Sequence, residues 1–117
     1  MRTFDTGATR DDETSKLDFE GFLSPAALAA FAAYMHKHRV QADGALRDSD
    51  NWQRGIPLTA YMKSAWRHFF EWWRLHRLHV AGATVPQAEI RDALCALLFN
   101  TMGYLHSIEV DNHDHGT

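Results

Sequence analysis

The chain has 117 residues, which is enough for a single domain (1–117) and leaves no room for a separate substrate domain. Apolar residues make up 45% of the sequence and charged residues 23%, which is the composition of an ordinary globular protein. The formal net charge is −3 and no half of the chain is strongly basic, which argues against a nucleic-acid polymer as a partner.

Residues 1–22 are polar and show little periodicity, so we expect a non-helical N-terminal arm. Four apolar side chains could anchor this arm to the body of the protein: Phe4, Leu17, Phe19 and Phe22. Ser24 and Pro25 then form a typical helix start, with Ser as the N-cap and Pro at the first helical position. Apolar residues repeat at helical spacing from there, which predicts a first helix at about residues 25–38.

Residues 40–56 are rich in turn-forming residues and predict a long loop. A loop of this length inside a compact domain is usually either functional or disordered. Trp52 favours an ordered loop, because a tryptophan side chain is on average well buried. We therefore expect an ordered functional loop close to the active face.

Two long amphipathic helices are predicted in the second half of the chain, at about residues 58–79 and 86–106. Pro57 or Thr59 opens the first of these helices, the second starts near Pro86, and Gly82 separates the two. The tail at residues 111–117 is polar and terminal, so we expect it to fray. The predicted fold class is all-α, a bundle of about three main helices.

Each of the two long helices carries a pair of potential metal ligands: His68 with Glu71, and Glu89 with Asp92. Residues three apart on a helix share a face, so the members of each pair point the same way. If the helices pack antiparallel, the pairs meet and offer oxygen ligands to a divalent cation. We therefore expect the three carboxylates to be catalytic and metal-binding, with His68 as a further ligand of Mg²⁺ or Mn²⁺.

The same residues also fit an ordinary helix surface. Acidic residues one turn apart occur on many solvated helices, and a histidine beside aromatic residues is more often a packing residue than a ligand. Glu71, however, lies between Phe70 and Trp72, which is an unusual position for a carboxylate that only aids solubility. That position favours the metal site.

Eight further residues are candidates for contacts with a substrate: Asn51, Trp52, Arg54, Lys63, Trp66, Arg67, Asn100 and Tyr104. Arg54 offers a guanidinium on an ordered loop, which suits phosphate oxygens, and Lys63 could help to hold a phosphate tail. Trp52 or Trp66 could stack on a nucleobase, although packing in the core explains a tryptophan equally well. Asn100 could hydrogen-bond a ribose or serve helix packing.

Six segments, which together span nearly residues 3–106, carry a resemblance to known proteins: Phe4–Asp11, Phe22–Pro25, Tyr34–Arg39, Arg47–Pro57, Tyr61–Ser64, and Asp92–Cys95 through His106. The loop segment RDSDNWQRGIP is the most specific of them. In these segments the chain resembles a largely phage-encoded family, the N-terminal domain of dATP/dGTP diphosphohydrolases. The Glu89-x-x-Asp92 step also resembles the all-α nucleoside triphosphate pyrophosphohydrolases of the MazG type.

This resemblance implies a MazG-like helical core and hydrolysis of dATP or dGTP to the monophosphate and pyrophosphate. It also implies that carboxylates on two neighbouring helices bind Mg²⁺, here Glu71, Glu89 and Asp92. The MazG pattern has two or three glutamates on its first metal helix, and His68 stands at one of those positions. Either His68 replaces a carboxylate ligand, or the site has fewer carboxylates and binds metal weakly.

The expected location is the cytoplasm, or the host cytoplasm if the chain is encoded by a phage. Cys95 is the single cysteine, the N-terminus lacks the apolar segment of a signal peptide, and no apolar run reaches the length of a membrane span. Seven Phe, four Trp and three Tyr exceed what a small core needs, which favours a homo-oligomer. The alternative to an enzyme is a non-catalytic helical interaction or regulatory module.

Overall fold

The computed structural model describes residues 2–3, 7, 9–10 and 15–114, and this part of the chain has the predicted all-α fold. Its elements in order are β1 (Arg2–Thr3), β2 (Thr9–Arg10), α1 (Phe19–Phe22), α2 (Pro25–Lys37), the 3-10 helix η2 (Asn51–Arg54), α3 (Leu58–Val80) and α4 (Gln87–Asp114). The strands pair antiparallel, with Arg2 opposite Arg10 and Thr3 opposite Thr9. Strands of two residues are too short to form a layer of the fold.

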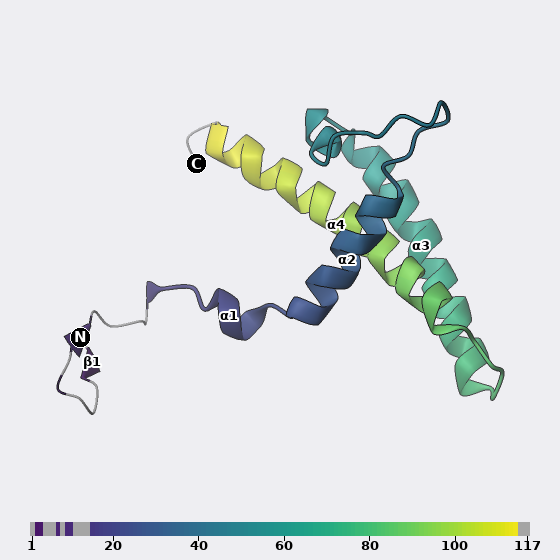
Figure 1. Cartoon of the computed structure of the whole chain (residues 1–117), viewed down its shortest axis with the longest axis horizontal. Helices are drawn as coiled ribbons and strands as arrows, with labels where there is room; N and C mark the ends of the chain where they lie inside the picture. Colours follow the sequence, from purple (N-terminus) through teal and green to yellow (C-terminus); the bar gives the residue numbers. More distant parts are fainter. Residues whose placement is uncertain (1, 4–6, 8, 11–14, 115–117) are drawn as a thin grey trace.

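Helices α3 and α4 form a long antiparallel hairpin, and most tertiary contacts of the described residues lie between them (Figure 1). Gly82 ends α3 with a φ of +95°, a left-handed conformation that lets the chain hydrogen-bond back to the last turn of the helix. The helices approach closely where the ring of Tyr61 lies over Gly103, because a side chain at position 103 would collide with that ring.

Helix α2 starts as the sequence predicts. The Ser24 Oγ accepts a hydrogen bond from the Ala27 N–H at 3.1 Å, and Pro25 occupies the first turn. In Figure 1, α2 crosses α4, and the two helices are in contact. The last turn of α2 therefore lies beside α4, where it can contribute to a site on the hairpin.

The loop at residues 40–56 has structure of its own. Val40 and Leu46 form an isolated antiparallel bridge, and the helical turn η2 follows. Trp52 packs edge-on against two rings of α4, with its centroid 6.5 Å from that of Phe99 and 4.8 Å from that of His106. These contacts hold the end of the loop against α4.

The C-terminal helix is longer than predicted. It runs to Asp114 instead of about residue 106, so the tail expected to fray is helical up to that residue. Residues 115–117 lie outside the described part of the chain. The sequence contains no glycine or proline between Gly103 and Asp114 that would stop the helix, and for this reason it continues.

The N-terminal arm also differs from the prediction, because it ends in the helical turn α1. The side chain of Asp18 caps this turn by accepting a hydrogen bond from the Gly21 N–H at 2.8 Å. The predicted anchors Leu17, Phe19 and Phe22 are exposed and do not hold the arm to the hairpin. The fourth, Phe4, lies outside the described residues.

The core of the described residues is small. Its buried side chains are Tyr61, Leu75, Ala93, Cys95, Ala96 and Asn100. The chain exposes 9434 Å², whereas a compact monomer of 13.4 kDa would expose roughly 6,500 Å². Many large apolar side chains therefore still face solvent. No helix in the described ranges combines the length and the apolar character needed to cross a lipid bilayer.

Candidate functional site

The four predicted metal ligands line one groove between α3, α4 and the end of α2. The residues that line it are Tyr34, His38, His68, Glu71, Glu89, Asp92, Ala93 and Ala96. The groove has a volume of about 290 Å³. The antiparallel hairpin thus brings the ligand pair of α3 to the ligand pair of α4.

Helix geometry explains this arrangement. His68 and Glu71 lie one turn apart in the middle of α3, and Glu89 and Asp92 lie one turn apart near the start of α4. The two alanines of α4 that also line the groove have small side chains, so space remains for a ligand.

Cationic side chains engage two of the three carboxylates. Arg74 donates from Nη2 to Glu71 Oε1 at 2.8 Å and from Nε to Oε2 at 3.2 Å. Lys37 Nζ lies 3.1 Å from Asp92 Oδ2 and 3.2 Å from its Oδ1, and so links α2 to α4. Both ion pairs are about half exposed to solvent, so another cation can replace either of them at little cost to stability.

The surroundings set the charge of three groups in the groove. Burial, followed by the charge of Arg67, lowers the pKa of His68 below its usual 6.5, so the imidazole is neutral at pH 7. The hydrogen bond from Arg74 lowers the pKa of the Glu71 carboxyl, which is therefore ionised. Burial is the main cause that raises the pKa of Tyr34 and keeps its phenol protonated. The groove offers a carboxylate, a neutral imidazole and a hydroxyl donor.

The chemistry of the ligands suits a hard divalent cation, which prefers carboxylate oxygens and also accepts an imidazole nitrogen. The side chains are not preassembled, because no three acidic, histidine or cysteine residues of the described chain lie close enough together to hold an ion. Glu71 and Asp92 point to Arg74 and Lys37 instead of to a shared centre. A cation held by both Glu71 and Asp92 would therefore displace both Arg74 and Lys37.

A second pocket adjoins the groove at His38, which lines both. It has a volume of about 510 Å³ and lies between α2, the loop and α4. Its apolar lining residues are Phe31, Ala32, Met35, Trp52, Ile56 and Phe99. Its other lining residues are polar or charged: His36, Arg39, Arg47, Asp48, Ser49 and Asn51. An apolar pocket with cationic groups among its lining suits a small organic anion.

Two predicted substrate contacts, Asn51 and Trp52, line this second pocket. Arg54 lines neither cavity and pairs with Asp48 at 3.2 Å. Lys63 and Arg67 do not line them either, and Arg67 Nη2 donates to the hydroxyl of the preceding turn of α3 at 2.9 Å. The structure thus separates these three cations from the groove.

The remaining three predicted contacts also lie elsewhere. Asn100 is buried and its Nδ2 donates to the Ala96 carbonyl at 2.8 Å, so it serves packing between the helices. Asn100 and Tyr104 line a different groove of the hairpin, and Trp66 is exposed on α3.

Several residues of the two cavities were not identified as site residues by sequence reasoning, among them Tyr34, His38, Arg39 and Arg47. Arg39 Nε donates to the Arg47 carbonyl at 2.7 Å, which ties the end of α2 to the loop. The sequence feature that could have indicated these residues is the cluster of cationic residues at the end of α2. It is a weak signal, because cations at a helix C-terminus are favoured by the helix dipole alone.

Comparisons with protein-family models, with curated proteins and with solved structures give no match to this chain. The resemblance to the MazG type therefore stays a prediction. A function for the groove must be argued from its own residues.

Proposed function

We propose that this protein hydrolyses the purine deoxynucleoside triphosphates dATP or dGTP to the monophosphate and pyrophosphate, in a metal-dependent reaction in the cytoplasm. The observation that carries the proposal is the meeting of Glu71, Glu89, Asp92 and His68 in one groove, although the two pairs come from different helices. A hard divalent cation accepts carboxylate oxygens and an imidazole nitrogen, and these four side chains would supply them once Arg74 and Lys37 release Glu71 and Asp92. The adjoining pocket has room for a nucleoside.

Glu71, Glu89 and Asp92 would hold Mg²⁺ or Mn²⁺, with His68 as a nitrogen ligand. The cation would neutralise charge on the triphosphate and lower the pKa of the attacking water. If His68 does not ligate the metal, its neutral imidazole can accept the proton of that water. Lys37 and Arg74, released from their carboxylates, would then be free to pair with phosphate oxygens.

The base would lie in the second pocket, where Trp52 offers an aromatic surface. Arg39 and Arg47 line the same pocket and offer guanidinium groups to phosphate oxygens, the role that the sequence suggested for Arg54. His38 lines both cavities, so a substrate that spans them would pass beside it. This placement puts the phosphates next to the carboxylates.

The test is turnover of dATP and dGTP by the purified protein with Mg²⁺ or Mn²⁺, with phosphate and pyrophosphate measured separately. Asp92→Asn and Glu71→Gln are each expected to reduce pyrophosphate release by at least about 100-fold. Glu109→Gln removes an exposed carboxylate of α4 outside the groove and is expected to leave turnover unchanged. Pyrophosphate release that both groove variants retain in full would disprove the mechanism.

A non-catalytic regulatory or interaction module is the second candidate. Two observations favour it: the ion pairs that already neutralise Glu71 and Asp92, and the large apolar side chains exposed on α3. Calorimetric titration with Mn²⁺ and with a non-hydrolysable dGTP analogue separates the two candidates. Binding of both supports the enzyme, and binding of neither supports the module.

A further inference from the structure

Both long helices carry a seam of residues at alternating spacings of three and four, which is the spacing of helices packed side by side. On α3 these residues are Tyr61, Ala65, His68, Trp72 and Leu75. On α4 they are Ala93, Ala96, Asn100, Gly103 and Ser107. All ten are buried or half-buried, so this inner seam is where the two helices of the hairpin meet.

Each helix also carries a second seam with the same spacing. On α3 it consists of Met62, Trp66, Phe69 and Trp73. On α4 it consists of Leu94, Leu98, Thr101, Leu105 and Ile108. All nine residues of this outer seam are exposed, and its eight apolar side chains retain between 37% and 67% of their accessible surface. The hairpin covers the inner seam of each helix, whereas the outer seam stays exposed in the described part of the chain.

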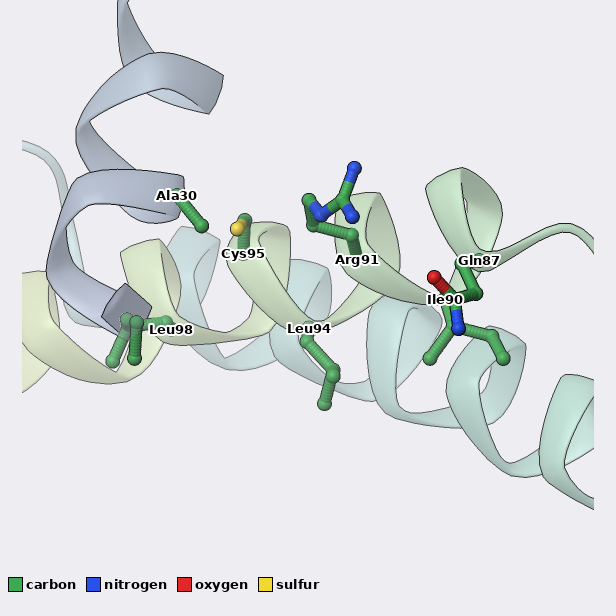
Figure 2. A pocket seen from close by; sticks show the side chains of 8 residues that line it. Ala30, Gln87, Ile90, Arg91, Leu94, Cys95 and Leu98 are labelled. Atoms are coloured by element: carbon green, nitrogen blue, oxygen red, sulfur yellow. The ribbon is translucent and has the colours of Figure 1, made fainter. Parts of the chain in front are cut away.

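The two halves of the outer seam lie on one side of the hairpin. Met62 of α3 lines a single groove together with Thr101, Leu105 and Ile108 of α4. Figure 2 shows that the seam continues along α4, where the Leu94 side chain projects away from α2. This end of the seam borders an apolar cavity of about 440 Å³ between α2 and α4. Along α4 the outer seam therefore extends from Leu94 to Ile108, and it meets the α3 half at Met62.

The acidic groove lies on the other side of the hairpin. Met62 and Glu71 are nine residues apart, which is about 2.5 turns and places them on opposite sides of α3. Asp92 and Thr101 have the same separation on α4. A partner on the outer seam would therefore leave the groove open to solvent.

We propose that the outer seam packs against the outer seam of a second copy of this chain, so that two hairpins form a four-helix bundle. The surface is complementary to itself. It contains no charged residue, its three aromatic side chains lie on α3, and its three leucines and its isoleucine lie on α4. A two-fold axis can therefore place the aromatic half of each copy over the aliphatic half of the other.

The size of the surface supports a stable dimer. With roughly 200 Å² for a fully exposed large apolar side chain, the exposed fractions of the eight apolar residues amount to roughly 750 Å². A stable interface buries about 800 Å² on each partner. The dimer would also cover roughly a quarter of the surface by which this chain exceeds a compact monomer.

The test is the mass of the full-length protein by sedimentation and by light scattering over a range of concentrations. The wild type is expected at twice the 13.4 kDa of one chain. The double substitution Leu94→Glu with Leu98→Glu places four charges in the interface and is expected to return the mass to that of one chain. Phe22→Glu alters a large exposed side chain outside the seam and is expected to leave the dimer intact.

A milder variant keeps the test valid if the double substitution unfolds the protein. Leu98→Ala is expected to raise the dimer dissociation constant by about 10- to 100-fold while the far-ultraviolet circular dichroism stays unchanged. A wild type that is monomeric at every concentration overturns the proposal. The partner on this surface would then be a different protein. An assembly whose dissociation constant is the same in wild type and Leu98→Ala overturns it as well.

Discussion

Lys37, the last residue of α2, holds Asp92 of α4 with its Nζ 3.1 Å from the carboxylate Oδ2. The same ammonium group lies 5.7 Å from the centre of the Tyr34 ring, one turn earlier on α2. This ion pair fastens α2 over the groove and puts a positive charge beside a proposed metal ligand. A divalent cation at Asp92 would compete with Lys37 for the same oxygens.

Lys37→Ala is expected to tighten the binding of Mn²⁺ in the groove, because the competing ammonium is gone. A half-exposed ion pair contributes at most about 1 kcal/mol, so the dissociation constant should fall by about two- to fivefold. Calorimetric titration without nucleotide measures this. Lys63→Ala, which removes a lysine outside the groove, is the matched control and should have no effect. Weaker Mn²⁺ binding by Lys37→Ala would contradict a competition between Lys37 and the ion for Asp92.

Gly103→Ala is expected to destabilise the protein by about 1–3 kcal/mol, because the added methyl group would collide with the Tyr61 ring. In an open helix the same change would stabilise by up to about 1 kcal/mol. Urea denaturation measures the difference. In a Tyr61→Ala background the collision is absent, so adding Gly103→Ala should be neutral or stabilising. A destabilisation of equal size in both backgrounds would show that the ring is not the cause.

His68 is expected to make the fold less stable as the pH falls through 6.5. Burial and Arg67 lower its pKa in the folded state, so below pH 6.5 the unfolded chain binds the proton more readily than the folded one. The loss of stability begins as the pH falls to the pKa that His68 has in the unfolded chain. It levels off below the pKa that His68 has in the folded protein. Well above pH 6.5 the imidazole is neutral in both states and contributes no pH dependence.

Urea denaturation of the wild type and His68→Gln between pH 5 and pH 8 measures this effect. The wild type should lose more stability than the variant below pH 6.5, and the two curves should run parallel above it. Nuclear magnetic resonance provides a direct check, since the His68 ring signal should titrate below 6.5. A midpoint above 6.5 would contradict the burial of this imidazole.

Cys95 is expected to react slowly with thiol reagents in the folded protein. The side chain is buried, and burial is the main cause that raises the pKa of its thiol, so little reactive thiolate forms at pH 7. Its rate with a disulfide reagent should be at least about tenfold below that of the same protein in urea. Equal rates in the folded protein and in urea would show that the contact between α4 and α2 around Cys95 opens freely.

Much of the local structure follows from the sequence because its causes are local. Ser24 and Pro25 start α2, and Gly82 ends α3, since capping and a left-handed turn depend on a few neighbouring atoms. The predicted end of α4, at about residue 106, was wrong because polar residues do not by themselves stop a helix. The spacing of three residues within each ligand pair likewise predicts a shared face without any knowledge of the partner helix.

The sequence by itself therefore determined the helices, their apolar faces and the pairing of His68 with Glu71 and of Glu89 with Asp92. Only the tertiary structure decided which apolar face α3 turns to α4 and which stays exposed, because periodicity reports that a face is apolar and not what covers it. It also decided that Arg39 and Arg47, and not Arg54, line the pocket that adjoins the groove. Contacts between residues far apart in sequence depend on how helices cross, and side-chain spacing along one helix does not contain that information.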